Sequence, residues 1–290
     1  MVSRKVFRRL AVIAAGAVVT LAVPAGASAA RAHTCGAEGP QTLEGNTAAP
    51  VEVVGTCLVD GGQAKVRGAL TVEPGGQLIA NFAFNTVRPG GANPRLLLFG
   101  NLTVKEGGVA IIGCEPFYFT CSGDEENTAT SRSVIRGNVN GRGAAGIILH
   151  AARIFGNVNQ VGGGAPESEC AIYSDYEDDL IHGNVTVREL DSCWLGLARD
   201  RVFGDMRIEN NHFEDPDAIE ILANRISRNL TCKGNGMVWN SREAEFGQEP
   251  LYPRVTERNT VGGKRGGQCV HSSPETLAAY EKGEFGEGAF

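Results

Sequence analysis

A short acidic stretch contains the side chains most suited to chemistry in this sequence. Within it stand Asp175, Glu177, Asp178 and Asp179. Carboxylate oxygens are the ligands that Ca²⁺ prefers, so Asp175, Asp178 and Asp179 are candidate calcium ligands. A calcium site beside a basic side chain would suit a lyase acting on acidic polysaccharides. Paired carboxylates alone would suit glycoside hydrolysis.

Three further residues extend this candidate site. His182 follows the acidic stretch and could act as a general acid. Asp200 and Arg201 lie about one repeat further along the chain, where they could supply a second carboxylate and a base or substrate clamp. In the stacked register described below, Asp179 and Asp200 share one column, and Arg201 and Arg225 share the next.

The same residues also have a purely structural interpretation, as a solvated face of mutually paired charges. The column that contains His182 elsewhere holds Phe99, Phe155 and Phe203, which favours a stacked ring over a general acid. The polygalacturonase set (Asn-Thr-Asp, Asp-Asp, Gly-His-Gly and Arg-Ile-Lys) is absent, as is the Gly-Gly-x-Gly-x-Asp calcium repeat. We therefore expect a structural or binding protein that needs no cofactor. A Ca²⁺-dependent lyase or hydrolase is the alternative.

The amino terminus has the pattern of a secretory signal peptide. A basic segment precedes an apolar run from Leu10 to Val23, and small residues follow up to Ala30. The run is shorter than the roughly 20 residues that span a bilayer, so a retained anchor is the weaker alternative. We expect cleavage before Ala30, which removes residues 1–29 and leaves a secreted or cell-surface protein without a membrane span.

Composition and charge exclude several other classes. Hydrophobic residues make up 42% of the 290 residues and charged residues 21%, which argues against disorder and against a polytopic membrane protein. The signal contains four cations and no acid, so the remaining chain has 23 cations, 33 acids and a formal charge of −10. This charge disfavours nucleic acid as a partner. Cell-wall or extracellular polysaccharide is the expected partner, and no pattern indicates an oligomeric state.

A recurring seven-residue pattern predicts the fold. It consists of an aliphatic residue, a spacer, Gly, usually Asn, an aliphatic residue, a spacer and often another aliphatic residue, as in LFGNLTV from Leu98 and IHGNVTV from Ile181. The repeat glycines are 19 to 37 residues apart, which is typical of solenoids. Polar and aliphatic residues alternate with the period of a strand, and no helical stripe is present. We therefore expect an all-β, right-handed parallel β-helix with two or three strands per coil.

Stacking the copies places like residues in columns. The expected core comprises Val66, Leu98, Ile135, Ile154, Ile181, Val202 and Ile226 before the Gly, and Leu70, Leu102, Val139, Val158, Val185, Met206 and Leu230 after it. We expect the Gly to adopt a left-handed conformation at a corner. The following residues should then hydrogen-bond to one another in a ladder, with Asp205 as an acceptor: Asn101, Asn138, Asn157, Asn184 and Asn229. A straight strand with Gly pointing inward is the alternative.

All eight Cys follow the signal peptide, which indicates disulfides in an oxidising compartment. No Cys-x-x-Cys pair is present, so zinc binding is the weaker interpretation. Cys170 and Cys193 are 23 residues apart, about one coil, and should be stacked within disulfide reach. We pair these two, and we pair Cys35 with Cys57, Cys114 with Cys121, and Cys232 with Cys269.

The domain organisation follows from these patterns. We expect a signal peptide over 1–29, an N-terminal segment with the first coil or cap over 30–65, the β-helix over 66–232 and a disulfide-linked extension over 233–290. Both ends should be capped, because a β-helix exposes unpaired strand edges. Ser before Pro predicts a short helix over 274–282.

Segments near both ends of the mature chain resemble a known group of proteins. These are VEVVGTCLVDGGQAKVRGALTVEPGGQL from Val51, NLTCKGN from Asn229 and NTVGGKRGGQC from Asn259. They are similar to exported actinobacterial β-helix proteins of unknown function, and the resemblance covers most of the chain after the signal. It implies a secreted right-handed parallel β-helix and brings no catalytic residues to carry over.

Overall fold

The computed structural model of the protein describes residues 31–60, 62–83, 93–116, 119–168, 170–213, 218–235, 238 and 258–270. The expected signal peptide and the expected helix over 274–282 lie outside these residues. Within the described part of the chain, the regular structure is β-strand, apart from one 3₁₀ turn, η1 (Pro166–Ser168).

The strands form three parallel sheets, called A, B and C here, and neighbouring strands of a sheet come from successive coils. Sheet A contains β1 (His33–Cys35), β4 (Val51–Val53), β7 (Leu70–Val72), β10 (Leu102–Val104), β13 (Val139–Arg142), β16 (Val158–Val161), β19 (Val185–Arg188), β22 (Met206–Glu209), β25 (Leu230–Lys233) and β27 (Arg265–Gly267). Sheet B contains β2 (Gln41–Thr42), β5 (Thr56–Asp60), β8 (Gln77–Phe82), β11 (Val109–Ile112), β14 (Gly146–His150), β17 (Ser174–Glu177), β20 (Leu195–Ala198) and β23 (Ile219–Leu222). Sheet C contains β3 (Gly45–Thr47), β6 (Gln63–Val66), β9 (Arg95–Leu98), β12 (Val134–Ile135), β15 (Arg153–Ile154), β18 (Leu180–Ile181), β21 (Arg201–Val202), β24 (Arg225–Ile226) and β26 (Thr260–Val261).

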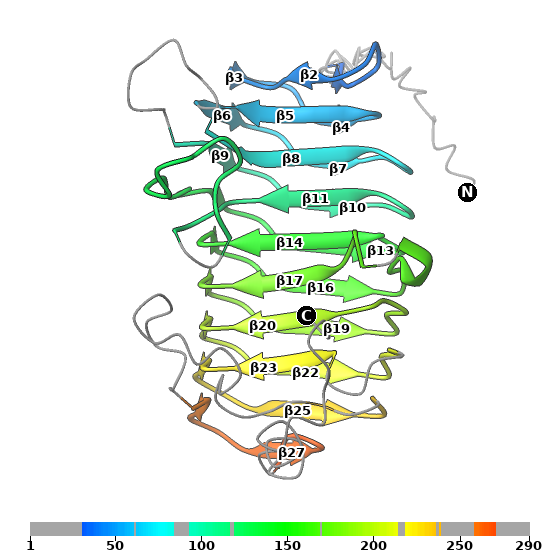
Figure 1. Ribbon diagram of the computed structural model, residues 1–290, viewed down its shortest axis with the longest axis vertical. Coiled ribbons are helices and arrows are strands. Elements are labelled where there is room, and N and C mark those ends of the chain that lie inside the picture. The colour runs from blue at the N-terminus through cyan, green and yellow to red at the C-terminus, as the bar shows by residue number, and fades with distance from the viewer. Residues whose placement is uncertain are drawn as a thin grey trace, which may run out of the picture. The chain divides into compact units, whose positions relative to one another are not determined.

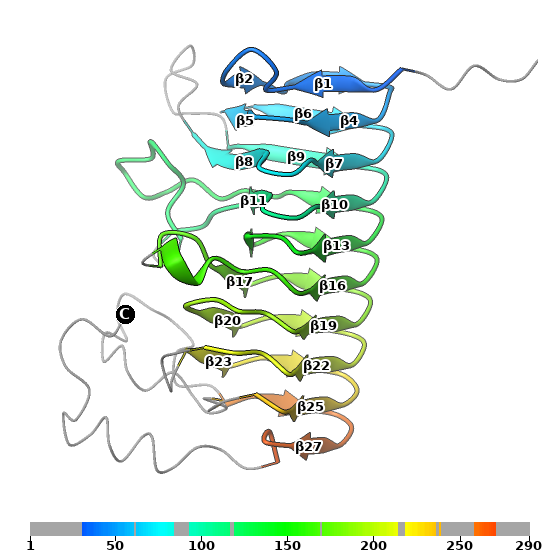
Figure 2. The same ribbon diagram turned by 90° about the vertical axis from the view of Figure 1, so that its right-hand side faces the viewer.

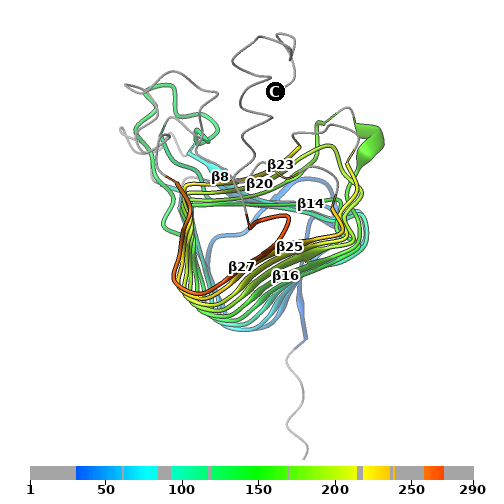
Figure 3. The same cartoon turned by 90° about the horizontal axis from the view of Figure 1, so that it is seen from below.

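Each coil passes from sheet C to sheet A, then to sheet B, and returns to sheet C one level further on. The strands of successive coils therefore lie one above another, as Figures 1 and 2 show. Viewed along the stack, the coils superimpose on three sides around a common interior (Figure 3). The described chain is a parallel β-helix, as the repeat predicted.

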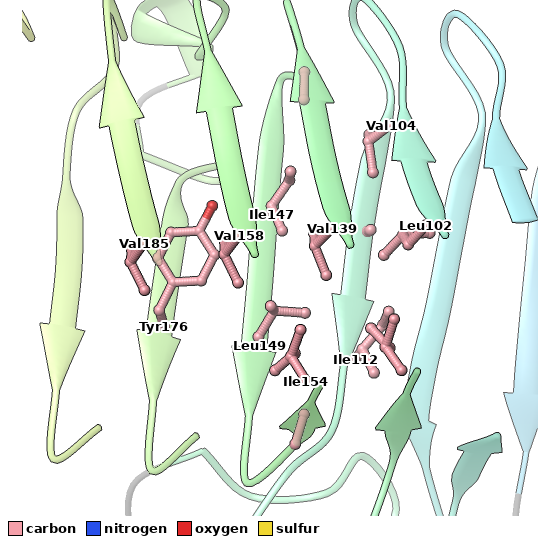
Figure 4. Close-up of a cluster of buried hydrophobic side chains, with 14 of the residues drawn as sticks. Leu102, Val104, Ile112, Val139, Ile147, Leu149, Ile154, Val158, Tyr176 and Val185 are labelled. Carbon is pink, nitrogen blue, oxygen red and sulfur yellow. The ribbon is translucent and has the colours of Figure 1, made fainter. Parts of the chain in front are cut away.

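Alternation along each short strand determines which side chains enter the core. In β10, Leu102 and Val104 are buried and Thr103 between them is only half-buried. All fourteen predicted core residues are buried, and none is more than 2% exposed. Figure 4 shows part of this stack, with side chains from neighbouring coils in contact in the interior. Burying each such aliphatic side chain stabilises the fold by about 1.5–3 kcal/mol.

Tyr176, Gln160 and Ser174 form a hydrogen-bonded polar group within this apolar interior. The hydroxyl of Tyr176 donates a hydrogen bond to Oε1 of Gln160, and Nε2 of Gln160 donates to Oγ of Ser174 at 2.9 Å. All three residues are completely buried. The bonds satisfy polar atoms that would otherwise lie without partners in the core.

The corner between sheets C and A contains a ladder, but its bonds differ from those expected. Oδ1 of Asn138 accepts the backbone N–H of Asn157 in the next coil at 2.8 Å, and the same side-chain-to-backbone bond recurs from coil to coil. The expected left-handed glycines were wrong, because no repeat glycine has a positive φ. Instead, a Cβ on Gly156 would lie 2.4 Å from Oδ1 of Asn138 and 2.5 Å from the carbonyl oxygen of Gly137. Glycine is needed because the preceding coil fills this space.

Asp205 takes the place of Asn in this ladder, as expected. Its Oδ1 accepts the backbone N–H of Asn229 at 3.0 Å and the side-chain Nδ2–H at 2.9 Å. Both bonds lower the pKa of Asp205 below its usual value, and the backbone bond has the larger effect. Burial acts in the opposite direction. Of the side-chain-to-side-chain bonds expected along the ladder, the described residues show the one from Asn229 to Asp205.

Four disulfides join the predicted pairs: Cys35–Cys57, Cys114–Cys121, Cys170–Cys193 and Cys232–Cys269. Their Cα separations of 4.9 to 5.6 Å lie within the usual range for a disulfide. The first pair links β1 to β5, and the last links β25 to the residue two positions after β27. The terminal coils are thus covalently attached to their neighbours.

Candidate functional site

The candidate residues Asp179 and Asp200 lie inside the corner between sheets B and C. They are only 2% and 0% exposed. Oδ1 of Asp200 accepts the backbone N–H of Asp179 at 2.9 Å, and Oδ1 of Asn224 accepts that of Asp200 at 2.9 Å. The column expected from the sequence is present, but it is a buried ladder and not a solvated face.

Both aspartates have an unsatisfied oxygen in this ladder. Oδ2 of Asp179 and Oδ2 of Asp200 have no hydrogen-bond partner among the described residues. Burial raises the pKa of each carboxyl well above its ordinary value of 3.8. Because their side chains are enclosed, neither carboxyl is accessible to a polysaccharide in this conformation.

Asp178 lies next to Asp179 in sequence but has a different environment. It has a left-handed φ of 51°, as does Arg199, with 58°, in the next coil. The Arg199 side chain donates Nε–H to Oδ2 of Asp178 at 2.7 Å and Nη2–H to Oε2 of Glu177 at 2.5 Å. Asp175, by contrast, contacts a histidine. The structure therefore does not bring Asp175, Asp178 and Asp179 together as one calcium site.

The outer face of sheet B instead assembles a cluster around His150. This residue ends β14 and lies opposite Glu177, the last residue of β17, while Asp175 stands two positions earlier on β17. His150 Nε2 is 2.8 Å from Asp175 Oδ2, and His150 Nδ1 is 3.7 Å from both Glu177 Oε2 and Glu115 Oε1. We call Glu115, His150, Asp175 and Glu177 the acidic cluster.

A loop between β11 and β12 covers the acidic cluster. The disulfide between Cys114 and Cys121 closes this loop, and the backbone N–H of Glu115 donates to the carbonyl of Phe119 at 2.8 Å. The Phe119 ring stacks on the His150 ring with centroids 4.2 Å apart. The His150 side chain is consequently 1% exposed, whereas that of Glu115 keeps 14% of its surface exposed. The cluster is enclosed but reaches solvent at its acidic edge.

The charges of the acidic cluster shift the pKa values of its members. Burial alone lowers the pKa of His150, but the neighbouring carboxylates, Asp175 foremost, raise it well above 6.5. Burial raises the pKa of Glu115 to about 7, although His150 acts in the opposite direction. The raised pKa favours a protonated His150 at neutral pH, and the Arg199 guanidinium supplies a second cation beside Glu177.

His150 and Glu115 were not singled out from the sequence. The sequence does contain a signal for His150. Ala152 and Asp179 take equivalent positions in successive coils, and His150 and Glu177 each stand two residues before them. Ala152 and Asp179 are linked by the ladder, with the backbone N–H of the first bonded to Oδ1 of the second at 2.7 Å. Glu115 has no comparable signal, since the repeat does not determine the path of its loop.

His182 lies in a stack of aromatic rings on the outside of sheet C. Its ring centroid is 4.8 Å from that of Phe155 and 5.1 Å from that of Phe203, with interplanar angles of 5° and 21°. Phe99 belongs to the same column and lies 4.9 Å from the guanidinium of Arg136. Phe155 remains 46% exposed. His182 is thus a stacked ring in this column, as the aromatic residues at the equivalent position of other repeats indicated.

The cations of sheet C lie beside these rings. The guanidinium of Arg153 is 5.4 Å from the Phe155 ring, and that of Arg201 is 4.9 Å from the Phe203 ring. Two columns of side chains face outward from sheet C. One runs from Lys65 to Thr260 and the other from Arg67 to Gly262, and neither contains Asp or Glu. Their cations are Lys65, Arg67, Arg136, Arg153, Arg201 and Arg225. We call these cations together with Phe99, Phe155, His182 and Phe203 the basic–aromatic strip.

Comparison of the chain with protein-family models, with curated proteins and with solved structures found no match. Its architecture is nevertheless plain from the three parallel sheets and four disulfides, which are compatible with an extracellular protein. Across the described ranges, no helix has the length and apolar character needed to cross a membrane.

Proposed function

We propose that this protein is a secreted structural β-helix that binds an anionic extracellular polysaccharide along the basic–aromatic strip. The observation that carries this proposal is the charge of the strip, which contains six permanent cations and no acid in a chain with a formal charge of −6. A cationic surface on an acidic protein concentrates anionic ligands at one face. The four disulfides fit a function outside the cytoplasm.

The packing of the strip supports recognition of carboxylate groups. Arg153 and Arg201 lie against phenylalanine rings, so their planar guanidinium groups are held in place. Neither forms an ion pair with a carboxylate in the part of the chain that the structure describes. A guanidinium group can bind a carboxylate through two parallel hydrogen bonds. Repetition of such groups along the stack suits a polymer with regularly spaced carboxylates.

A nucleic acid fits the strip less well. The rings of Phe155, His182 and Phe203 already stack on one another at about the spacing of the coils, so no space remains for a base between them. A lyase or hydrolase is likewise less well supported, because Asp179 and Asp200 are enclosed within the ladder.

The proposal is tested by calorimetric titration of the purified protein with polygalacturonate, with neutral dextran as the comparison. We expect binding to polygalacturonate only, weakened by salt because the contacts are exposed charges. The double variant Arg153→Ala/Arg201→Ala should bind about tenfold more weakly, or ~1.4 kcal/mol. The control Arg142→Ala/Arg207→Ala removes the same charge from exposed positions on sheet A and should bind normally.

Equal weakening of the two double variants would mean that net charge and not the strip determines binding, which would contradict the proposal. Tighter binding to single-stranded DNA than to polygalacturonate would contradict the choice of polysaccharide. Release of unsaturated sugar products during the titration would show catalysis and would favour the lyase.

A further inference from the structure

The acidic cluster contains buried polar atoms that the described residues leave unsatisfied. His150 Nδ1, Asp175 Oδ1 and Glu115 Oε1 have no hydrogen-bond partner within the described part of the chain. The side chains of His150 and Asp175 are only 1% and 5% exposed, so bulk solvent does not satisfy them. Each buried polar atom without a partner costs about 1–3 kcal/mol. Three such atoms from one cluster indicate a missing ligand.

The spacing of the side chains identifies that ligand as a cation. One ligand atom from each of His150, Asp175 and Glu177 lies within 4.8 Å of the other two. Two ligands that bind one zinc ion at about 2.0–2.2 Å lie within about 4 Å of each other, so the three atoms have nearly the spacing of a metal site. The 3.7 Å between His150 Nδ1 and Glu177 Oε2 is too long for a hydrogen bond but is compatible with two ligands of a common ion. We propose that His150, Asp175 and Glu177 bind a divalent transition-metal ion.

The ligand types determine the class of metal. An imidazole nitrogen with two carboxylates suits zinc and manganese. Calcium instead takes six to eight oxygen ligands and is not bound through imidazole. The site therefore shares only Asp175 with the calcium site suggested by the acidic stretch of the sequence, and it suits a different metal.

The surroundings of the three ligands are those of a prepared site. Arg199 holds Glu177 through Nη2, and Phe119 stacks on the ring of His150, so both ligands have restricted orientations. Such outer contacts commonly orient metal ligands. Glu115 adds a further carboxylate 3.7 Å from His150 Nδ1 and is partly exposed, which leaves a route for an ion. This inference is independent of polysaccharide binding, because the cluster lies on sheet B and the basic–aromatic strip on sheet C.

The test uses the purified protein after treatment with a chelator and dialysis, titrated calorimetrically with Zn²⁺, Mn²⁺ and Ca²⁺. We expect one Zn²⁺ or Mn²⁺ ion per chain, and binding of Ca²⁺ at least about tenfold weaker. His150→Gln should abolish binding. The matched control His182→Gln removes an exposed histidine from the basic–aromatic strip and should leave binding unchanged.

A second variant and a second measurement test the proposal even if His150→Gln does not fold. Asp175→Asn keeps the size of the side chain and should weaken Zn²⁺ binding by about 10- to 100-fold. The melting temperature of the wild-type protein should also rise with the Zn²⁺ concentration, since the ion binds only the folded state. Absence of stoichiometric Zn²⁺ or Mn²⁺ binding by the wild type, tighter binding of Ca²⁺, or an equal loss in His182→Gln would overturn the proposal.

Discussion

Asn224 and Asp200 occupy successive positions of one buried ladder but satisfy it differently. Oδ1 of each accepts a backbone N–H of the neighbouring coil at 2.9 Å. Nδ2 of Asn224 also donates to the carbonyl of Leu197 at 2.6 Å, whereas Oδ2 of Asp200 has no partner among the described residues. A carboxylate cannot donate a hydrogen bond, but a protonated carboxyl can. The ladder thus favours the neutral form of Asp200.

The first prediction is that Asp200→Asn stabilises the protein at neutral pH. The amide would supply the donor that a carboxylate lacks and would remove a buried ionisable group. We expect a gain of about 1–3 kcal/mol in the free energy of unfolding, measured by urea denaturation. Asp205→Asn is the matched control, because Asp205 is an acceptor in the other ladder. A gain of the same size in both variants would contradict the explanation.

The buried carboxyl of Asp200 should also make the free energy of unfolding depend on pH. Burial, followed by the charge of Asp179, raises the pKa of Asp200 well above 3.8 in the folded state. The folded protein therefore binds more protons than the unfolded chain in the interval between the two pKa values. The contribution of Asp200 is complete below about pH 3.8, falls as the pH rises above it and is lost once the pH exceeds the folded-state pKa. In a pH series of urea denaturations, Asp200→Asn should show a smaller loss across this interval than the wild type.

Tyr176→Phe should destabilise the core although it leaves the ring in place. The substitution removes the hydroxyl that donates to Oε1 of Gln160 and leaves this completely buried oxygen without its donor. We expect a loss of about 1–3 kcal/mol in thermal or urea unfolding. Tyr173→Phe removes a hydroxyl from a half-buried ring that packs edge-on against Trp194 and should change stability little. Equal losses in the two variants would argue against the buried hydrogen bond as the cause.

Gly156→Ala should destabilise the corner between sheets C and A. Its Cβ would meet Oδ1 of Asn138 at 2.4 Å, and both the ladder and the backbone would have to shift. Overpacking of this kind costs about 1–3 kcal/mol. At Gly266 a Cβ would be 3.5 Å from Oγ1 of Thr231, an ordinary contact, so Gly266→Ala is the control. If the two alanine variants melted at the same temperature, steric exclusion at the corner would be ruled out.

The disulfide between successive coils should contribute more than the one within a loop. Cys170 and Cys193 are separated by 23 residues, and Cys114 and Cys121 by 7. By loop-closure entropy, replacing the first pair with Ala should cost about 3 kcal/mol and replacing the second about 2 kcal/mol. Chemical denaturation of both double variants would measure this order. The reverse order would show that the native loop contacts outweigh chain entropy.

The amino-acid sequence was sufficient to predict the coils and their core. Strand periodicity places Leu102 and Val104 inside and Thr103 outside, and the Gly-Asn pair aligns one coil with the next. Because stacked coils repeat the same contacts, a local pattern determines a global register in this fold. The disulfide between Cys170 and Cys193 follows from that register, since residues one coil apart are neighbours.

Only the tertiary structure revealed why the repeat needs glycine and where the acidic side chains meet. The close approach of Asn138 Oδ1 to Gly156 depends on the distance between coils, which a one-dimensional pattern does not contain. Glu115 reaches His150 from an irregular loop, whose path depends on packing and on its disulfide. The repeat therefore determined the stacked coils. The acidic cluster depends instead on contacts between these coils and an irregular loop that the repeat does not describe.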